Sequence, residues 1–286
     1  MKEKAVCDRL LHEAEEYDER AGLLGALESG EDFRIAQNLH SNYIMFVRFN
    51  TLMSALRKLL PPAANVLSCG CGPARYEIAF ANAGYNVWAY DNSAEMVNIA
   101  QMNFKRYGAR ASHIFQANEL SIGSELRHRR ARNFDLIWGA SILHHLADGF
   151  RLTQSLREFV GPKTIGVFME PVSNPLANWF RKSSLNIYAS AQTETEEPLS
   201  ETAYKTMLGC LFSDVSVHYR LSLFSGAQKV GRKVLGDGVR MKFSKLCFSL
   251  DQTLECIGLA KPLTWHAVII AKRPMMASEP CVVSQP

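Results

Sequence analysis

The sequence predicts an α/β fold in which helices cover both faces of one mostly parallel sheet. Three observations predict this fold. Short apolar runs alternate with amphipathic stretches across residues 65–170, as expected of repeated strand–helix–strand units. The first apolar run ends in the glycine turn Ser68-Cys-Gly-Cys-Gly72. The second ends at Asp91, and a turn and a carboxylate so placed mark the ligand-binding carboxyl edge of a doubly wound sheet.

The segment before the first strand predicts N-terminal helices. Residues 5–21 carry an apolar stripe at helical spacing that stops at Gly22. Residues 33–60 carry a second such stripe, which ends at Pro61-Pro62. We therefore expect residues 1–62 to form a helical cap or lid on the core.

The core is predicted from short strand patterns that alternate with helical patterns. The strand patterns are rich in apolar, β-branched and aromatic residues, and they end where glycine or polar residues begin. We expect residues 63–220 and 263–273 to form this core. Its expected strands are 65–68, 87–90, 112–116, 134–139, 164–170, 214–219 and 265–272, and its expected helices are 76–83, 96–107, 150–160 and 201–209.

An insertion, residues 221–262, precedes the last expected strand. Its second half places Phe243, Leu246 and Leu250 on one stripe of an expected helix at 243–257. We expect this helix to cap a pocket or to form a homodimer contact. Residues 274–286 have the composition of a disordered tail.

Composition excludes several classes of partner. The chain has 286 residues, of which 47% are hydrophobic, and its net charge is +4 with 21% charged residues. This charge is too balanced for a protein that mainly binds nucleic acid. No apolar stretch approaches the roughly 18 residues of a membrane span, so we expect no membrane segment and a cytoplasmic location. The Cys69 and Cys71 pair lacks a second pair at metal-site spacing, so no metal is expected.

The glycine turn and the acidic strand end predict a nucleotide-like ligand. Gly70 and Gly72 lack Cβ atoms, so the backbone can turn tightly there and a ligand can approach it. Asp91 lies nineteen positions after Gly72. A carboxylate there can accept hydrogen bonds from both hydroxyls of a ribose.

Three ordered motifs resemble those of class I S-adenosylmethionine-dependent methyltransferases, most strongly the small-molecule branch. Val66-Leu-Ser-Cys-Gly-Cys-Gly72 resembles the first motif, Asp91-Asn-Ser-Ala-Glu-Met96 the second, and Phe134-Asp-Leu-Ile-Trp-Gly-Ala-Ser-Ile-Leu-His-His-Leu146 the fourth-strand segment. The resemblance covers about residues 40–220 and the strand at 265–272. It implies a Rossmann-like, seven-stranded sheet, S-adenosylmethionine as cofactor, and methyl transfer to a small, secondary-metabolite-like acceptor.

The resemblance also implies a set of cofactor-binding residues. Ser68 stands where the family usually has an acid that helps to hold the amino group of the cofactor, and it offers only a hydroxyl. Gln116 stands where an Asp commonly faces the adenine, and its amide can pair with that base. Tyr17 matches an N-terminal tyrosine that folds over the cofactor in related enzymes, although it can equally serve helix packing. The expected cofactor-binding residues are Ser68, Gly70, Cys71, Gly72, Asp91, Asn92, Met96, Gln116, Ala117, Gly139, Ala140 and Tyr17.

Three residues are candidates for acid–base chemistry. Methyl transfer from a sulfonium needs alignment of donor and acceptor, and a base only where the acceptor must lose a proton. His144 and His145 follow the fourth strand, where the resemblance places the meeting point of donor and acceptor, and a structural role is the alternative. Glu170 ends the fifth strand. Its carboxylate can orient a substrate or accept a proton, or it can instead bind backbone amides of the neighbouring loop.

Two other functions stay open beside methyl transfer. A nicotinamide (NAD)-dependent oxidoreductase also uses a glycine turn and a ribose-binding acid, but Ala74 stands where its third glycine is expected. A non-methylating protein on the same fold, either a partner protein or a catalyst of a cofactor-assisted rearrangement, is kept open by Ser68. The chain lacks the Asn/Asp-Pro-Pro-aromatic run of enzymes that methylate DNA bases, so a small-molecule acceptor is favoured.

Overall fold

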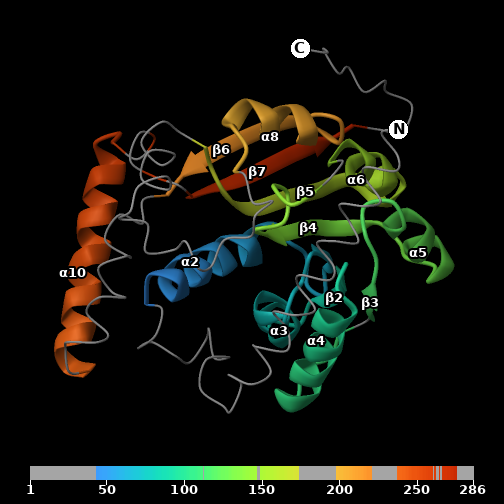
Figure 1. Cartoon of the computed structure of the whole chain (residues 1–286), viewed down its shortest axis with the longest axis horizontal. Coiled ribbons are helices and arrows are strands. Elements are labelled where there is room, and N and C mark those ends of the chain that lie inside the picture. The colour runs from blue at the N-terminus through green and yellow to red at the C-terminus, as the bar shows by residue number, and fades with distance from the viewer. Residues whose placement is uncertain are drawn as a thin grey trace.

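The computed structural model contains one seven-stranded sheet between two layers of helices (Figure 1). It describes residues 43–111, 113–146, 149–173, 198–220, 237–259, 261, 264 and 266–275. The strand order is β3-β2-β1-β4-β5-β7-β6, so the doubly wound, mostly parallel sheet predicted from the sequence is confirmed. The strands are β1 (Asn65–Cys69), β2 (Asn86–Asp91), β3 (His113–Gln116), β4 (Phe134–Ala140), β5 (Val160–Pro171), β6 (Phe212–Tyr219) and β7 (His266–Pro274).

The described helices connect these strands and cover both faces of the sheet. One of them, α5, lies in a stretch for which the sequence predicted no element. It has only seven residues, and Ser121 before it makes no side-chain capping bond, so its sequence signal is weak. The helices are α2 (Tyr43–Leu59), α3 (Arg75–Asn82), α4 (Ala94–Arg106), α5 (Ile122–His128), α6 (Gly149–Leu156) with the 3₁₀ turn η1 (Arg157–Phe159), α8 (Glu201–Leu208) and α10 (Asp237–Cys256).

The pairing of the strands sets one common carboxyl edge. Strands β1 to β5 pair in parallel, whereas β7 runs antiparallel between β5 and β6. The carboxyl ends of β1, β2, β3, β4 and β5 therefore meet at the same side of the sheet, where an open α/β sheet binds its ligand. The three ordered motifs of the sequence analysis end at this edge.

Alternate residues of each strand enter two separate cores. Leu67 and Ile137 pack into the cluster that includes buried residues of α5, α6 and α8. Val66 and Leu136, one position earlier on the same strands, pack into the cluster of α2, α3 and α4. Successive side chains of a strand point to opposite faces, so this division shows that helices bury both faces of the sheet.

The segments that flank the core are described only in part. In α2, Met53 and Leu56 are buried in the same cluster as β1, so this helix packs directly on the sheet. Of the predicted segments 1–62, 221–262 and 274–286, the structure describes residues 43–62, 237–259, 261, 274 and 275. Within the described ranges, no helix combines the length and the apolar character that a membrane span requires.

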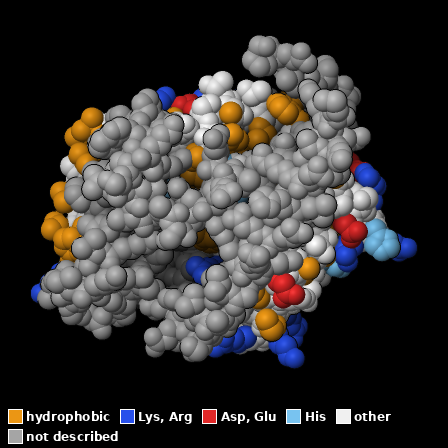
Figure 2. Space-filling view, viewed as in Figure 1, with side chains coloured by type: hydrophobic (Ala, Val, Ile, Leu, Met, Phe, Trp, Pro, Cys, Tyr) orange, Lys and Arg blue, Asp and Glu red, His pale blue; other side chains and the backbone are white. Residues whose placement is uncertain are grey.

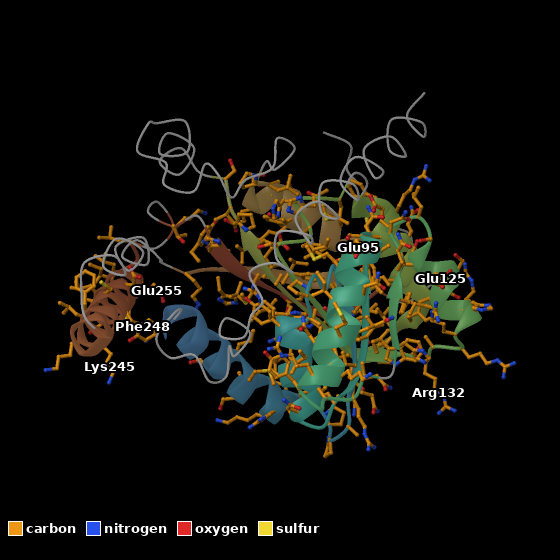
Figure 3. All side chains as sticks on the ribbon, turned by 60° about the horizontal axis from the view of Figure 1, so that its bottom comes forward. Glu95, Glu125, Arg132, Lys245, Phe248 and Glu255 are labelled. Atoms are coloured by element: carbon orange, nitrogen blue, oxygen red, sulfur yellow. The ribbon has the colours of Figure 1, made fainter. Side chains whose placement is uncertain are left out.

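Helix α10 lies at the end of the molecule opposite α5, and Lys245 and Glu125 mark the two ends in Figure 3. It contacts α2. Cys247 and Asp251 are buried, whereas Leu246 and Leu250 are 57% and 42% exposed. Figure 2 shows hydrophobic side chains at the surface on this side of the molecule.

Candidate functional site

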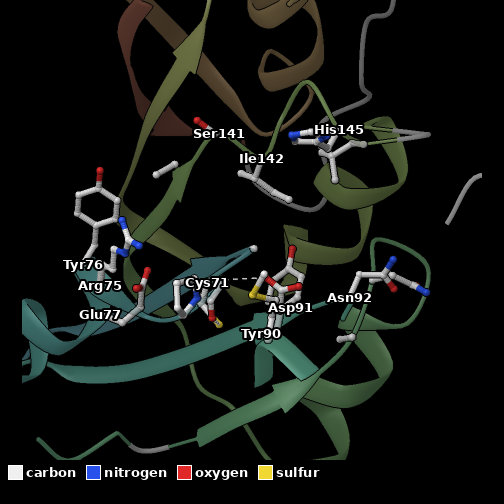
Figure 4. Close-up of a pocket in the computed structure, with 18 of the residues that line it drawn as sticks. Cys71, Arg75, Tyr76, Glu77, Tyr90, Asp91, Asn92, Ser141, Ile142 and His145 are labelled. Atoms are coloured by element: carbon white, nitrogen blue, oxygen red, sulfur yellow. Dashed lines mark hydrogen bonds between the residues drawn. The ribbon is translucent and has the colours of Figure 1, made fainter. Parts of the chain in front are cut away.

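A cavity of about 370 Å³ opens at the carboxyl edge of the sheet, between the loops that follow β1, β2, β3 and β4 (Figure 4). Its volume is typical of a site for a small molecule or cofactor. In Figure 4, Glu77 lies at one end of the cavity and Asn92 at the other. Ile142 and His145 form the wall opposite Asp91.

The glycine turn after β1 adopts a backbone conformation that favours glycine. Gly70 and Gly72 have φ values of +63° and +47°. A Cβ atom on Gly70 would lie 2.5 Å from Cδ1 of Ile142, whereas a Cβ on Gly72 would meet no described atom within 4 Å. Gly70 is therefore packed against the loop after β4, and Gly72 leaves room above the turn. The N–H of Cys71 donates to the carbonyl of Tyr90 at 2.9 Å and fixes the turn to β2.

Asp91 joins the glycine turn to the start of α4. Its Oδ2 accepts the N–H of Gly72 at 2.7 Å, and its Oδ1 accepts the N–H of Ser93 at 3.0 Å. Ser93 is also the N-cap of α4, because its hydroxyl accepts the N–H of Met96 at 3.0 Å. The carboxylate predicted to bind a ribose thus also organises the loops around it.

Ser68 lies behind the cavity wall and contacts a carboxylate that the sequence analysis did not single out. The Ser68 hydroxyl donates to Oε1 of Glu77 at 2.6 Å. Glu77 belongs to α3, lines the cavity and is 2% exposed. Its Oε2 is buried and has no hydrogen-bond partner among the described residues. Burial raises the pKa of Glu77 to about 7, although the bond from Ser68 acts in the opposite direction.

Aromatic packing fixes the position of α3 over the sheet. Trp138 of β4 is fully buried, and the rings of Tyr76 and Phe80 pack edge-on against it with centroids 5.3 Å away in each case. Burial raises the pKa of Tyr76 to about 12, so its hydroxyl stays neutral. These contacts determine where the first turn of α3, and with it Glu77, meets the cavity.

Glu170 organises the loop after β4 and is not among the residues that line the cavity. It is fully buried, and its Oε1 accepts the N–H groups of Ile142 at 2.9 Å and Leu143 at 3.0 Å. Its Oε2 lies 2.7 Å from Nδ1 of His144, which is also buried. The geometry supports the alternative weighed from the sequence, in which this carboxylate binds backbone amides. His145 alone of the two histidines lines the cavity, and the rings are 4.1 Å apart.

The end of β4 is tightly constrained. Ser141 has a φ of +56°, an uncommon conformation for a residue with a side chain, and its N–H donates to the carbonyl of Met169 at 2.8 Å. A Cβ on Gly139 would lie 2.6 Å from Cγ2 of Ile142 and 2.9 Å from Cδ1 of Phe168. Close packing therefore accounts for Gly139, which does not line the cavity.

The cavity brings together most of the predicted residues but not all of them. Ser68, Gly139, His144 and Glu170 lie behind its wall for the reasons given above. Gln116 is exposed, and its amide donates to the carbonyl of Asn92 at 2.9 Å instead of facing the cavity. Tyr17 lies outside the described residues. The predicted residues that line the cavity are Gly70, Cys71, Gly72, Asp91, Asn92, Met96, Ala117, Ala140 and His145.

Other lining residues were not predicted. Several come from the first turn of α3, whose position depends on packing and leaves no motif in the sequence. Others follow a predicted strand directly, and their position after that strand is the signal that could have found them. The additional lining residues are Pro73, Arg75, Tyr76, Glu77, Tyr90, Asn118, Glu119, Ser141, Ile142 and Leu146.

Comparisons with known proteins agree with this geometry. Residues 66–163 match the family model described as a methyltransferase domain. The fold is similar to that of a putative sarcosine dimethylglycine methyltransferase from Galdieria sulphuraria, at 13% identity over 88% of this chain and 97% of that one, with a TM-score of 0.54. It is also similar to a chain in the complex between the Haloferax volcanii Trm112 methyltransferase activator and a putative methyltransferase. The identity is 12% over 91% of this chain and 98% of that one, with a TM-score of 0.53. No curated protein matches the chain.

Proposed function

We propose that this chain, which carries a class I S-adenosylmethionine-dependent methyltransferase domain, transfers a methyl group from S-adenosylmethionine to a small organic acceptor. The observation that carries the proposal is the cavity at the carboxyl edge, which the first two motifs and the fourth-strand loop enclose together. The domain match decides against the NAD-dependent oxidoreductase that the glycine turn alone left open.

The residues of the cavity fit the cofactor. The open space above Gly72 admits a ligand against the backbone of the turn. The Asp91 carboxylate can accept ribose hydroxyls, since a carboxylate has about four acceptor positions and the two amides use only part of them. When bound, the cofactor supplies an electrophilic methyl group on a sulfonium sulfur.

The wall opposite Asp91 provides the groups that can act on an acceptor. Ile142 and Leu146 are apolar and keep water away from this side of the cavity. His145 is the imidazole that lines it, and an imidazole can take a proton from an acceptor hydroxyl or amine near neutral pH. We assign His145 as the candidate base, with His144 and Glu170 as positioning residues that hold its loop.

The ion pairs of the basic surface run favour a small-molecule acceptor over a nucleic acid as the substrate. The basic run at residues 127–132 is partly neutralised, because Arg127 pairs with Glu158 and Arg129 pairs with Glu125 at 3.0 Å. Arg129 also lies over the ring of Phe115, with 4.5 Å from its guanidinium carbon to the ring centroid. These contacts reduce the positive charge that this run offers to phosphates.

The outward face of α10 supports a homodimer contact more than a cap on the pocket. Leu246 and Leu250 are exposed and lie one helical turn apart, and Ile257 beyond the helix is 63% exposed. Light scattering on the purified chain tests this point. We expect a dimer that Leu246→Glu converts to a monomer without loss of cofactor binding, and a monomeric native chain would refute the contact.

Two measurements test the proposed reaction. Calorimetry should detect binding of S-adenosylhomocysteine and none of NAD. Incubation with S-adenosylmethionine and small-molecule extracts should then release S-adenosylhomocysteine, which mass spectrometry detects together with the methylated product. Binding without any such release across varied extracts would favour the non-methylating alternative.

A matched pair of variants tests the assignment of the base. His145→Ala should lower kcat at least about 10-fold while affinity for S-adenosylhomocysteine stays within about 3-fold, since acid–base catalysis typically contributes 10²- to 10⁴-fold. His144→Ala should instead lower the melting temperature, because it leaves the buried Glu170 oxygen without its partner. Equal turnover in His145→Ala and the native enzyme would show that no base acts there.

A further inference from the structure

The amino-acid end of the cofactor needs a counter-charge that the glycine turn does not supply. This end carries a positively charged ammonium group, and a buried ammonium requires an ionic partner or good hydrogen-bond acceptors. On β1, Ser68 stands where the resemblance predicts an acid, and its hydroxyl donates to Glu77. The question is therefore which residue of this chain meets the ammonium.

Glu77 has the geometry of such a partner. Its Oε1 is held by the Ser68 hydroxyl at 2.6 Å, while its Oε2 is buried without a hydrogen-bond partner among the described residues. A buried carboxylate oxygen without a donor is costly, and in native proteins it usually marks a site that a ligand completes. Because Glu77 also lines the cavity, a donor that enters the cavity can reach it.

The position of Glu77 within the cavity agrees with the order of the ribose and the amino-acid end along the cofactor. Figure 4 places Glu77 at one end, Asp91 in the middle and Asn92 at the other end. An adenosyl group whose ribose meets Asp91 directs its amino-acid end either toward Asn92 or toward Glu77. Among the described residues that line the cavity, Glu77 is the one carboxylate with a buried oxygen that has no hydrogen-bond partner.

The charged groups around Glu77 do not neutralise its carboxylate. The groups that face it are Asp91 from β2, the thiol of Cys71, and Tyr76 on α3. Asp91 repels the charged form of Glu77, and burial keeps Cys71 and Tyr76 protonated. The Ser68 hydroxyl and the backbone N–H groups of Tyr76 and Glu77 favour the charged form, but none of these donors carries a charge. Within the described ranges, Glu77 forms no ion pair with a basic side chain, although Arg75 is a close neighbour in the chain.

We propose that Glu77 binds the ammonium group of the cofactor and that Ser68 orients its carboxylate for this contact. The inference rests on the proposed function, since it takes S-adenosylmethionine as the ligand. It also accounts for the hydroxyl on β1: the resemblance predicts an acid at this position of the strand, and this chain has Ser68, which binds the carboxylate of the facing helix at 2.6 Å.

Paired ligands separate this contact from cofactor binding in general. S-adenosylhomocysteine carries the amino-acid end, whereas 5′-methylthioadenosine has the same adenosine thioether without it. By calorimetry, Glu77→Gln should weaken binding of S-adenosylhomocysteine roughly 10- to 100-fold, the typical loss of a charged hydrogen bond. The same substitution should change the affinity for 5′-methylthioadenosine less than about 3-fold, because that ligand makes no such contact.

Two further variants make the result specific. Glu119→Gln is the matched control, because Glu119 is also a buried carboxyl that lines the cavity, and it should change both affinities by the same factor. Ser68→Ala keeps Glu77 but removes its orienting hydrogen bond. It should therefore lower the affinity for S-adenosylhomocysteine a few-fold and leave the affinity for 5′-methylthioadenosine unchanged. This variant also serves as the test should Glu77→Gln fail to fold, which circular dichroism would reveal.

Proton linkage gives a second readout at pH 7. An ammonium beside Glu77 favours the ionised form of a carboxyl whose pKa burial has raised, so binding of S-adenosylhomocysteine should release protons, measured in buffers of different ionisation enthalpy. Equal losses for both ligands in Glu77→Gln, or no loss, would overturn the assignment of Glu77. A native chain that binds neither ligand would instead overturn the proposed function itself.

Discussion

The Asp91 carboxylate accepts the backbone N–H of Gly72 at 2.7 Å, so the residue expected to bind the ribose also holds the turn on which the ligand rests. Its other oxygen accepts the N–H of Ser93 and thereby reaches α4. One side chain therefore joins the loops after β1 and β2. A substitution there acts on the shape of the cavity as well as on the ligand.

Asp91→Asn should weaken binding of S-adenosylhomocysteine by roughly 10-fold or more, since an amide cannot accept both backbone N–H groups and hydrogen bonds to charged groups contribute about 1.5–3 kcal/mol. Calorimetry gives the affinity. The matched control is Asp135→Asn, because Asp135 also accepts a backbone N–H, that of Asn65 at 2.8 Å, but at the opposite edge of the sheet. The control should lower stability and leave affinity unchanged; equal affinity in both variants would refute the role of Asp91.

Alanine at the two glycines of the turn should have different effects. Gly70→Ala should destabilise the fold by more than about 2 kcal/mol, because backbone strain of about 1–2 kcal/mol adds to the clash with Ile142. Gly72→Ala should lower stability only by the backbone strain. It should nevertheless lower the affinity for the cofactor at least 10-fold, because the new methyl group fills the space above the turn. Gly84→Ala, with a φ of +89° and no described neighbour within 4 Å, measures the strain alone. Chemical denaturation and calorimetry distinguish these outcomes.

Glu170→Ala should lower the free energy of unfolding by at least about 3 kcal/mol, the usual effect of removing one partner from a buried charged network. Three donors, from Ile142, Leu143 and His144, lose their acceptor together. Urea denaturation provides the measurement, and Glu158→Ala, at an exposed ion pair, is the control expected to change stability by less than about 1 kcal/mol. Comparable small effects of both substitutions would contradict the network.

The protein without ligand should become less stable as pH rises from about 4.5 to 7 through the contribution of Glu77. Burial raises the pKa of Glu77 from 4.5 to about 7, so the folded state holds a proton that the unfolded state has already lost. This contribution is complete below pH 4.5, falls by about 3 kcal/mol by pH 7, and then stays constant. Glu201 titrates lower, since its hydrogen bond with Lys205 holds its pKa to about 2, and it adds little across this range.

Denaturation of the native chain and of Glu77→Gln at several pH values isolates that contribution, because the other groups cancel in the difference. The two curves should diverge between pH 4.5 and 7. Saturating S-adenosylhomocysteine should reduce the divergence, since a cation beside Glu77 favours its charged form. Parallel curves would show that Glu77 has an ordinary pKa in the folded protein.

The sequence predicted the sheet and half of the cavity because both follow from local patterns. Apolar runs identify strands, and in a parallel sheet the residues after Cys69 and at Asp91 must meet at one edge. Gly72 and Asp91 could therefore be assigned to one site before any contact was known. The short α5 lacked a comparable pattern, and Gly123 within it weakens the helical signal.

The contacts that define the rest of the site depend on how distant elements pack. Glu77 meets Ser68 only because Tyr76 and Phe80 dock α3 on Trp138. Glu170 reaches His144 through the pairing of β4 with β5, which no periodicity encodes. For this reason the sequence could name Glu170 as a candidate without deciding between a catalytic and a structural role.

The position of Ile142 limits how this enzyme could be re-engineered. Its side chain fills the space beside both Gly70 and Gly139, so the loops after β1 and β4 interlock through one residue. Neither loop can retreat to admit a bulkier compound without disturbing the other. Libraries that aim to broaden the choice of acceptor should therefore leave Ile142 intact and diversify Leu146, which also lines the cavity.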